Sequence, residues 1–335
     1  GYNYIALGST TEEQSIIIEN KEISLEELYN AHCETLEPIF PTKSVDIKEK
    51  IETINFISQG EAKKSSITIA KPRVFIPTFP GTNCEYDLQR AFEKAGSNTN
   101  IEVFKNLTYK DIEDSIETIV NQIRKSQIIM LPGGFSAGDE PDGSAKFMAT
   151  VFRNPKVAEA VNEFLTKQDG LMLGICNGFQ ALIKLGLVPY GEIRETTVDA
   201  PTLTYNNIGR HQSKIVRTRI ASNKSPWLKA TEVGDTHSIA ISHGEGKFVA
   251  SEEVMRQLIA NGQIATQYVD FNDNATYDID FNPNGSTYAV EGITSADGRI
   301  FGKMGHSERI GEHVIKNIIG EKDQKIFESG VNYFK

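Results

Sequence analysis

Residues 174–178 read Gly-Ile-Cys-Asn-Gly and place Cys176 between two glycines at the end of an apolar run. The apolar residues at 171–175 predict a strand, and those at 179–185 predict a helix. A strand that turns into a helix through Gly-x-nucleophile-x-Gly is a nucleophile elbow, because the sharp bend projects the central side chain above the sheet. The helix N-terminus also favours a thiolate, since its unpaired N–H groups carry partial positive charge. The stretch therefore predicts an α/β fold with a reactive cysteine.

A histidine and a carboxylate far along the chain supply the other parts of an activated thiol site. Residues 305–309 read Gly-His-Ser-Glu-Arg. His306 is the best base among the six histidines, because Glu308 can accept a hydrogen bond from its other ring nitrogen and fix its tautomer. Two alternatives stand beside this hypothesis: Cys176 is a buried structural cysteine, and residues 306–308 are a solvated helix start. The elbow and the His-x-Glu pair together favour catalysis.

The composition indicates a globular protein of 335 residues, enough for one large or two moderate domains. A net charge of −10 argues against nucleic acid or an anionic membrane as a partner. Three widely spaced cysteines form no disulfide framework and no CxxC zinc pattern, so we expect no metal site and a reducing, cytoplasmic location. No apolar run reaches the roughly 18 residues that a membrane span needs.

Three segments are expected along the chain. Residues 1–45 predict a short strand at 16–18 and a helix from 24 to about 33, followed by prolines that stop regular structure. Residues 46–71 are polar and rich in lysine, and we interpret them as a linker. Residues 72–335 form the third segment.

From residue 72 onward, strands and helices alternate, which predicts a doubly wound, mostly parallel sheet. After about residue 190 the pattern becomes richer in strands, with a hairpin around residues 296–298. A last helix is expected at residues 307–319, closed by Gly320. Such a sheet gathers its ligands at the carboxyl ends of its strands.

Glycine-rich loops are expected at that edge. Residues 132–136 read Pro-Gly-Gly-Phe-Ser. Gly133 and Gly134 suit an oxyanion hole, because backbone N–H groups reach a developing alkoxide only where no side chain intervenes; Asn177 N–H would be the second donor. An ordinary glycine turn is the alternative. Cys84, in Pro-Gly-Thr-Asn-Cys at residues 80–84, also follows a strand but lacks flanking glycines, so we interpret it as structural.

A second His/Glu pair lies in residues 242–247, which read Ser-His-Gly-Glu-Gly-Lys. These residues could line the cleft or form a surface loop, and the spacing alone does not decide between the two.

These motifs, in this order, resemble one known family: the class I (triad) glutamine amidotransferase domain of phosphoribosylformylglycinamidine synthase, a purine-pathway enzyme. The resemblance covers roughly residues 72–335. Residues 34–41 resemble the end of the synthetase region in the long, single-chain form, which implies that residues 1–45 are a remnant of that region and the chain a C-terminal fragment. Ser307 is a departure, because many relatives have proline between the triad histidine and glutamate.

The resemblance implies a flavodoxin-like fold and a glutaminase mechanism. Cys176 attacks the carboxamide of L-glutamine, and backbone N–H groups near Gly134 and Asn177 hold the oxyanion. His306, oriented by Glu308, protonates the leaving ammonia and then activates the water that hydrolyses the glutamyl thioester.

The resemblance also implies the substrate contacts and the partner. Gln180 would help hold the glutamine with Gly133, and Phe135 and Asp139 are weaker candidates. Ammonia would pass internally to the synthetase half, which uses ATP and Mg²⁺, while the glutaminase domain needs no cofactor.

Two other functions are alternatives to the glutaminase. A DJ-1-like cysteine hydrolase would use the same sheet, but such proteins usually place the histidine soon after the nucleophile. A non-catalytic interaction module would be indicated by loss of the cysteine, histidine or glutamate, and all three are present.

Overall fold

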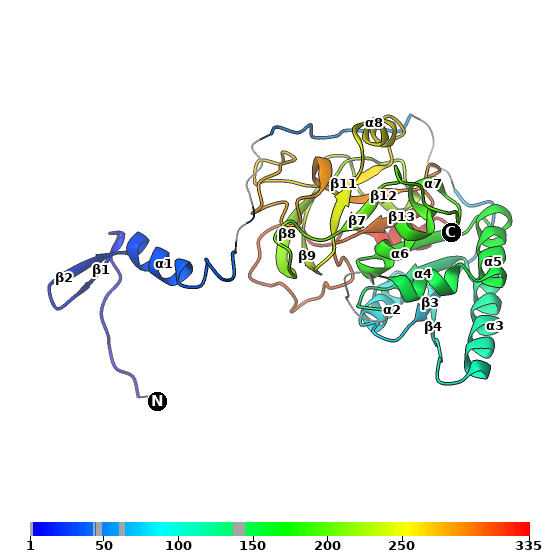
Figure 1. The fold of residues 1–335 in the computed structure, drawn as a ribbon, viewed down its shortest axis with the longest axis horizontal. Coiled ribbons are helices and arrows are strands. Elements are labelled where there is room, and N and C mark those ends of the chain that lie inside the picture. The colour runs from blue at the N-terminus through cyan, green and yellow to red at the C-terminus, as the bar shows by residue number, and fades with distance from the viewer. Residues whose placement is uncertain (1–2, 43, 45–48, 60–63, 137–144) are drawn as a thin grey trace. The chain divides into compact units, whose positions relative to one another are not determined.

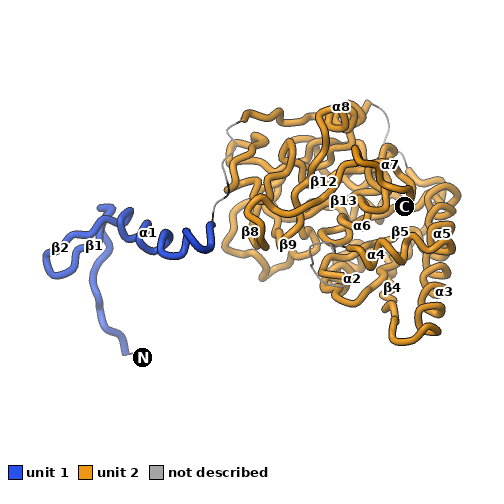
Figure 2. The backbone as a smooth tube through the Cα atoms, in the orientation of Figure 1, with its two compact units in different colours: residues 1–44 blue, residues 45–335 orange. Residues whose placement is uncertain are grey.

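The computed structural model describes residues 3–42, 44, 49–59, 64–136 and 145–335, and the chain forms two compact units, residues 1–44 and 45–335 (Figures 1 and 2). In the first unit, β1 (Ser15–Ile18) pairs with the antiparallel β2 (Lys21–Ser24), and α1 (Leu25–Glu34) follows. Ser24 begins this helix because its side chain accepts a hydrogen bond from Glu26 N–H. The strand and helix expected here are confirmed, and α1 buries none of its residues.

The second unit is built on one large sheet, which within the described residues has the strand order β4-β3-β5-β6-β13-β12-β11-β8-β9. The first five strands pair in parallel and the others antiparallel. The parallel strands are β3 (Arg73–Thr78), β4 (Asn98–Val103), β5 (Ile128–Leu131), β6 (Leu171–Ile175) and β13 (Ile300–Lys303). The antiparallel strands are β8 (Gln212–Ile220), β9 (Thr236–His243), β11 (Ile264–Tyr268) and β12 (Val290–Thr294). A separate pair joins β7 (Thr202–Thr204) to β10 (Lys247–Val249).

The burial pattern along the strands explains why one half of the sheet is parallel and the other antiparallel. Strands β5 and β6 bury every residue, as a parallel strand covered on both faces must, and their sequences are continuous apolar runs. Strand β8 instead alternates more and less exposed residues, as expected where one face of an antiparallel sheet meets water. The parallel half has the chain order 2-1-3-4-5 of flavodoxin-like folds. The predicted α/β, doubly wound class is confirmed.

Helices cover this sheet (Figure 1). Helix α3 packs against α5, and α2 packs against α9. Thr108 begins α3 with a capping box, because its side chain accepts from Asp111 N–H while the Asp111 carboxylate accepts from Thr108 N–H. No helix in the described part of the chain is long and apolar enough to cross a membrane. The helices of this unit are α2 (Glu85–Lys94), α3 (Tyr109–Lys125), α4 (Lys146–Phe152), α5 (Pro155–Lys167), α6 (Asn177–Leu185), α7 (Leu187–Tyr190), α8 (Glu252–Ala260) and α9 (Ile326–Asn332), with short 3-10 turns at Pro226–Leu228 and Thr287–Ala289.

The helix predicted at residues 307–319 is wrong. These residues are irregular, and the last helix is α9, at Ile326–Asn332. Ile315 has a φ of +54°, which a helix does not allow. The apolar residues that suggested the helix remain exposed at Val314 and Ile319, so no packing surface holds a helical face here.

The segment interpreted as a linker, residues 46–71, belongs to the second unit, and its described residues make contacts there. Ile54 is 3% exposed and its N–H donates to Gln267 Oε1 at 2.8 Å. Phe56 forms a parallel bridge with Ser222. Farther along, Ile69 N–H donates to Phe334 O at 2.7 Å. Ile54 accounts for part of the difference, because this apolar residue is buried in the core within a polar stretch.

Candidate active site

Cys176 lies at the turn between β6 and α6, with the backbone of a nucleophile elbow. Its φ of +54° and ψ of −106° are strained for a residue with a side chain. A Cβ on Gly178 would lie 2.0 Å from Leu131 O, and one on Gly174 would lie 2.6 Å from Gly178 O. Only glycine fits at either position, so the elbow has the close strand–helix approach that the sequence predicted.

The ends of two strands, β13 and β9, contact the nucleophile. Cys176 N–H donates to Lys303 O, at the end of β13, at 2.8 Å. Its Sγ lies 3.7 Å from Ser242 O, near the end of β9. The side chain is almost fully buried at the N-terminus of α6.

His306 and Glu308 form a buried pair beside the elbow. Nδ1 of His306 and Oε1 of Glu308 are 2.6 Å apart, and His306 N–H donates to Ala240 O on β9 at 2.8 Å. Burial lowers the pKa of His306, but the Glu308 charge and hydrogen bonds with Cys176 and Cys84 raise that pKa well above its ordinary value. Burial raises the pKa of Glu308, but the imidazolium outweighs this and the pKa is lowered. The pair therefore favours the imidazolium form of His306.

Gly133 touches the reacting groups. A Cβ at this position would lie 2.9 Å from His306 Cε1, 3.1 Å from Cys84 Sγ and 3.5 Å from Cys176 Cβ. The absence of a side chain here leaves room for the imidazole, and the loop at residues 132–136 reaches the site at the carboxyl edge of the sheet, as expected.

Gly134 has a φ of +134° and forms an isolated bridge with Thr82. The bonds of that bridge run from Asn83 N–H to Gly133 O and from Phe135 N–H to Gly81 O, at 3.1 and 2.8 Å. The bridge thus uses the amide of Phe135 and not that of Gly134. An oxyanion role for Gly134 and Asn177 stays a prediction.

Side-chain amides tie α6 to the surrounding loops. Asn177 accepts from Ser136 N–H at 3.2 Å and donates to Gln180 Oε1 at 2.8 Å, and Gln180 Nε2 donates to Glu245 O at 2.6 Å. Both ends of the Gln180 amide are therefore bound by the protein itself. These bonds connect Gln180 to the loops around the site, and the predicted contact of Gln180 with glutamine stays a prediction.

The remaining sequence-predicted substrate residues differ in their placement. Phe135 is 37% exposed, with its ring centroid 6.0 Å from that of His211. Asp139 lies outside the described residues.

The second His/Glu pair lies beside the site. His243 is buried, and its Nδ1 lies 3.2 Å from Asn206 Oδ1. Burial, followed by the charges of His306 and His211, lowers the pKa of His243 to about 3. His243 is therefore neutral at physiological pH. Together with the Ser242 contact to the nucleophile and the Glu245 bond to Gln180, this places residues 242–245 around the thiol.

Cys84 and Arg309 were missed as site residues by the sequence analysis. Cys84 Sγ lies 3.8 Å from His306 Nδ1, and Arg309 donates to the same sulfur at 3.3 Å. No local sequence pattern predicts these contacts, because Cys84 lies in the β3–α2 loop, far from residue 306 in sequence. Their signal is positional only: Cys84 follows a strand at the carboxyl edge of the sheet.

Cys84, His306 and Glu308 together offer three possible metal ligands within 4.8 Å of one another. The 2.6 Å between Nδ1 and Oε1 is a hydrogen-bond distance, whereas two ligands on a tetrahedral zinc lie roughly 3.3 Å apart. The Arg309 guanidinium also competes for the sulfur. The cluster therefore suits a protonated His–Glu pair better than a metal ion.

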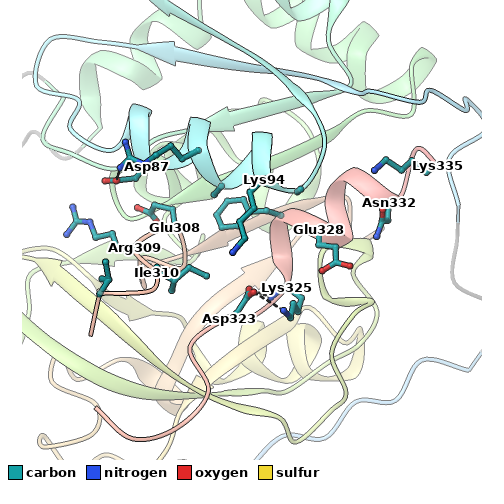
Figure 3. A pocket seen from close by; sticks show the side chains of 16 residues that line it. Asp87, Lys94, Glu308, Arg309, Ile310, Asp323, Lys325, Glu328, Asn332 and Lys335 are labelled. Atoms are coloured by element: carbon teal, nitrogen blue, oxygen red, sulfur yellow. Dashed lines mark hydrogen bonds and ion pairs between the residues drawn. The ribbon is translucent and has the colours of Figure 1, made fainter. Parts of the chain in front are cut away.

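A cavity of about 860 Å³ adjoins the triad at Glu308 (Figure 3). It lies between α2, α9 and the irregular segment that follows Arg309. Its charged side chains include two ion pairs, Arg90 with Asp87 and Lys325 with Asp323. Cys176 and Gly133 are not among the residues that line it, so this cavity is distinct from the space around the thiol.

Comparison with known proteins gives one consistent result. The chain is 34% identical over 241 residues to the phosphoribosylformylglycinamidine synthase subunit PurQ of Dehalococcoides mccartyi, covering 72% of this chain and 86% of that protein. For PurQ of Thermotoga maritima the identity is 30% over 267 residues, covering 79% and 99%. The solved structure of PurLQS from Thermotoga maritima matches with a TM-score of 0.55 and 28% identity, over 79% of this chain and all of that chain (100%). Residues 71–334 match the CobB/CobQ-like glutamine amidotransferase domain, and the chain therefore belongs to that family.

Proposed function

We propose that this chain is a glutaminase that hydrolyses L-glutamine to glutamate and ammonia for phosphoribosylformylglycinamidine synthesis. The observation that carries the proposal is the buried His306–Glu308 pair beside Cys176 at a strained strand–helix turn. The PurQ relatives support the purine-pathway reaction.

The geometry supports a thioester mechanism. The Cys176 thiolate attacks the glutamine carboxamide carbon, and the carbonyl oxygen becomes an oxyanion. The imidazolium of His306 gives its proton to the departing nitrogen, so ammonia leaves as the C–N bond breaks. Neutral His306 then takes a proton from water, whose oxygen attacks the thioester and releases glutamate and the thiolate. Glu308 stabilises the imidazolium in each half of the cycle.

The oxyanion would be held by backbone N–H groups of Gly134 and Asn177. Asn177 is the first residue of α6, where helical N–H groups lack intrahelical acceptors. Glutamine would bind between the loop at residues 132–136 and residues 242–245, both of which reach the thiol. Gly133 would leave space for the substrate, and Phe135 would border it.

The proposed partner is a synthetase half that accepts the ammonia, as the match to PurLQS suggests. ATP and Mg²⁺ would be bound by that half, and no residue of this chain is assigned to them. Ammonia is protonated in neutral water and loses its nucleophilic lone pair, which favours transfer along a sealed route. The cytoplasm is the proposed location, since the mechanism needs Cys176 as a free thiol and the three cysteines are unpaired.

We also propose that residues 72–335 are the amidotransferase domain, with residues 46–71 leading into it. Residues 1–45 would be a remnant of the synthetase region, and the exposed surface of α1 supports a segment that packs on another part of an enzyme. Family membership favours this account over the DJ-1-like and non-catalytic alternatives.

Glutamate release by the full chain, supplied with its synthetase partner, tests the proposal. Cys176→Ala should abolish glutamine-dependent turnover while synthesis from added ammonia continues. Cys33→Ala, in α1 of the first unit, is the matched control and should leave both activities unchanged. Glutamine-dependent turnover that survives in Cys176→Ala would refute the assignment of the nucleophile.

A further inference from the structure

A fully buried ion pair lies beside the triad loop. Lys303 is the last residue of β13 and Glu291 the second of β12, and both side chains are 0% exposed. Lys303 Nζ and Glu291 Oε1 are 3.1 Å apart. Burying two charges costs more free energy than their attraction usually returns, so such a pair is weak grounds for stability. The other hydrogen-bond partners of the two side chains indicate the role of this ion pair.

The two side chains bind both polar groups of the Gly305 backbone, the carbonyl and the N–H. Lys303 Nζ donates to Gly305 O at 2.7 Å, and Gly305 N–H donates to Glu291 Oε1 at 2.6 Å. Thr266 Oγ1 donates to the other carboxylate oxygen, which fixes the orientation of Glu291. Gly305 comes immediately before His306, so the position of its peptide groups determines the position of the His306 side chain.

Glycine is required at this position for the contact to form. A Cβ on Gly305 would lie 2.8 Å from Glu291 Oε1 and 3.1 Å from Lys303 Nζ. A side chain would thus push away both members of the ion pair. The close approach of a buried carboxylate and ammonium to one backbone residue depends on the glycine.

The same ammonium binds the residue on the other side of His306. Lys303 Nζ lies 3.0 Å from Ser307 Oγ, and Ser307 Oγ donates to Gln324 Oε1 at 2.6 Å. Gln324 Nε2 in turn donates to Thr218 Oγ1 on β8 at 3.1 Å. Ser307 therefore supplies an anchor that a proline between the histidine and the glutamate could not supply.

We propose that Lys303 and Glu291 are positioning residues that hold Gly305 and Ser307 and thereby aim His306 between Cys176 and Glu308. This inference rests on the proposed glutaminase function. The physical reason is that a short buried hydrogen bond such as Nδ1–Oε1 tolerates little displacement of either partner. A buried network in which every member is satisfied fixes one loop conformation, where exposed side chains would allow several.

Steady-state glutaminase kinetics of the full chain with its synthetase partner provide the first test. Lys303→Met keeps the length of the side chain and removes its charge and donors. It should lower kcat by roughly tenfold to a hundredfold, the scale of a misplaced catalytic group, while KM changes by less than about threefold. Ser307→Ala should lower kcat less, because Gly305 remains held.

Arg299→Met is the matched control. Arg299 precedes the same strand and also forms ion pairs, with the largely buried Asp169 at 3.4 Å and with the more exposed Asp297 at 2.6 Å. Its partners do not touch residues 305–308, so its loss should destabilise the fold while kcat per folded molecule stays unchanged. Equal loss of kcat in Arg299→Met and Lys303→Met would overturn the positioning role.

The positioning role can be tested even if the Lys303→Met variant does not fold. The charge-neutral double variant Glu291→Gln/Lys303→Met leaves no unpaired buried charge and should also lose kcat. A double-mutant cycle of Lys303→Met with Ser307→Ala should give losses that are not additive, since both changes act on one loop. Additive losses would contradict the proposal.

Histidine-selective NMR separates this inference from the proposed function. A proton shared between His306 Nδ1 and Glu308 gives a resonance far downfield of ordinary ring protons. We expect that resonance in wild type and Arg299→Met and its shift or loss in the charge-neutral double variant. An unchanged resonance would overturn the inference whether or not the chain turns over glutamine. A wild type that shows the resonance but no turnover would count against the glutaminase alone.

Discussion

Nδ1 of His306 and Oε1 of Glu308 lie 2.6 Å apart with both side chains buried, and this contact pairs Nδ1 with the carboxylate. With Nδ1–H donated to the carboxylate, Nε2 is left to exchange a proton with Cys176 and with the leaving nitrogen. The negative charge of Glu308 also favours the imidazolium. The carboxylate orients and stabilises, and the imidazole transfers the proton.

Replacing these two residues should therefore give unequal losses. His306→Ala removes the proton donor and should lower kcat for glutamine hydrolysis by roughly 10²–10⁴-fold. Glu308→Gln keeps the shape of the side chain and removes its charge, so the loss should be smaller than that of His306→Ala. Initial rates of glutamate release measure both. Equal losses would indicate that Glu308 takes part more directly than this account allows.

Gly133 should tolerate no side chain. Gly133→Ala would place a methyl group 2.9 Å from His306 Cε1 and should displace the imidazole, with at least a roughly tenfold fall in kcat. The control is Gly311→Ala, whose Cβ would meet Val314 Cγ2 at 3.5 Å, an ordinary contact. Full activity in Gly133→Ala would show that the imidazole can move without cost, contrary to the geometry.

Acid should destabilise the fold through His243. Its pKa is about 3 in the folded state, against an ordinary value near 6.5, because burial disfavours the charged ring. Between these values the unfolded chain binds more protons, so the free energy of unfolding falls as the pH drops from about 6.5 toward 3. The contribution of neutral His243 to the free energy of unfolding, relative to acid pH, is fully present above pH 6.5 and is on the order of a few kcal/mol.

Urea unfolding at a series of pH values measures this effect. Trp227 is the only tryptophan of the chain and is fully buried in the second unit, so its fluorescence follows the unfolding of that unit. His243→Asn should flatten the dependence of the free energy of unfolding on pH in the acid range. His32→Asn, an exposed position in α1, should leave it as in wild type. Identical slopes for wild type and His243→Asn would mean that His243 is not held neutral.

The parts of the site that the sequence predicted are those encoded by neighbouring residues. The elbow is a contiguous pattern in which glycines flank Cys176, and the pair of His306 and Glu308 is only two residues apart. The alternation of strands and helices predicted a doubly wound, mostly parallel sheet, and the observed strand order brings the ends of β5, β6 and β13 to one edge. These inferences need only local geometry and the topology of a doubly wound sheet.

The parts that escaped prediction depend on contacts between distant segments. Cys84 meets Arg309, and Lys303 meets Glu291, through the assembled sheet alone. A lysine at the end of the apolar segment 300–303 was nevertheless a signal, because a buried lysine needs a partner. The prediction of a helix at 307–319 was wrong because its apolar residues have no surface to pack on, and the local spacing alone does not show this.

The central claim is that Cys176 is an activated thiol in a glutamine pocket. Intact mass and peptide mapping after incubation with the glutamine analogue 6-diazo-5-oxonorleucine test it directly, using the full chain with its synthetase partner. We predict one adduct, on Cys176, that excess glutamine prevents and that Cys176→Ala lacks. A folded protein that gains no adduct on Cys176, or gains it on Cys84, would contradict the account.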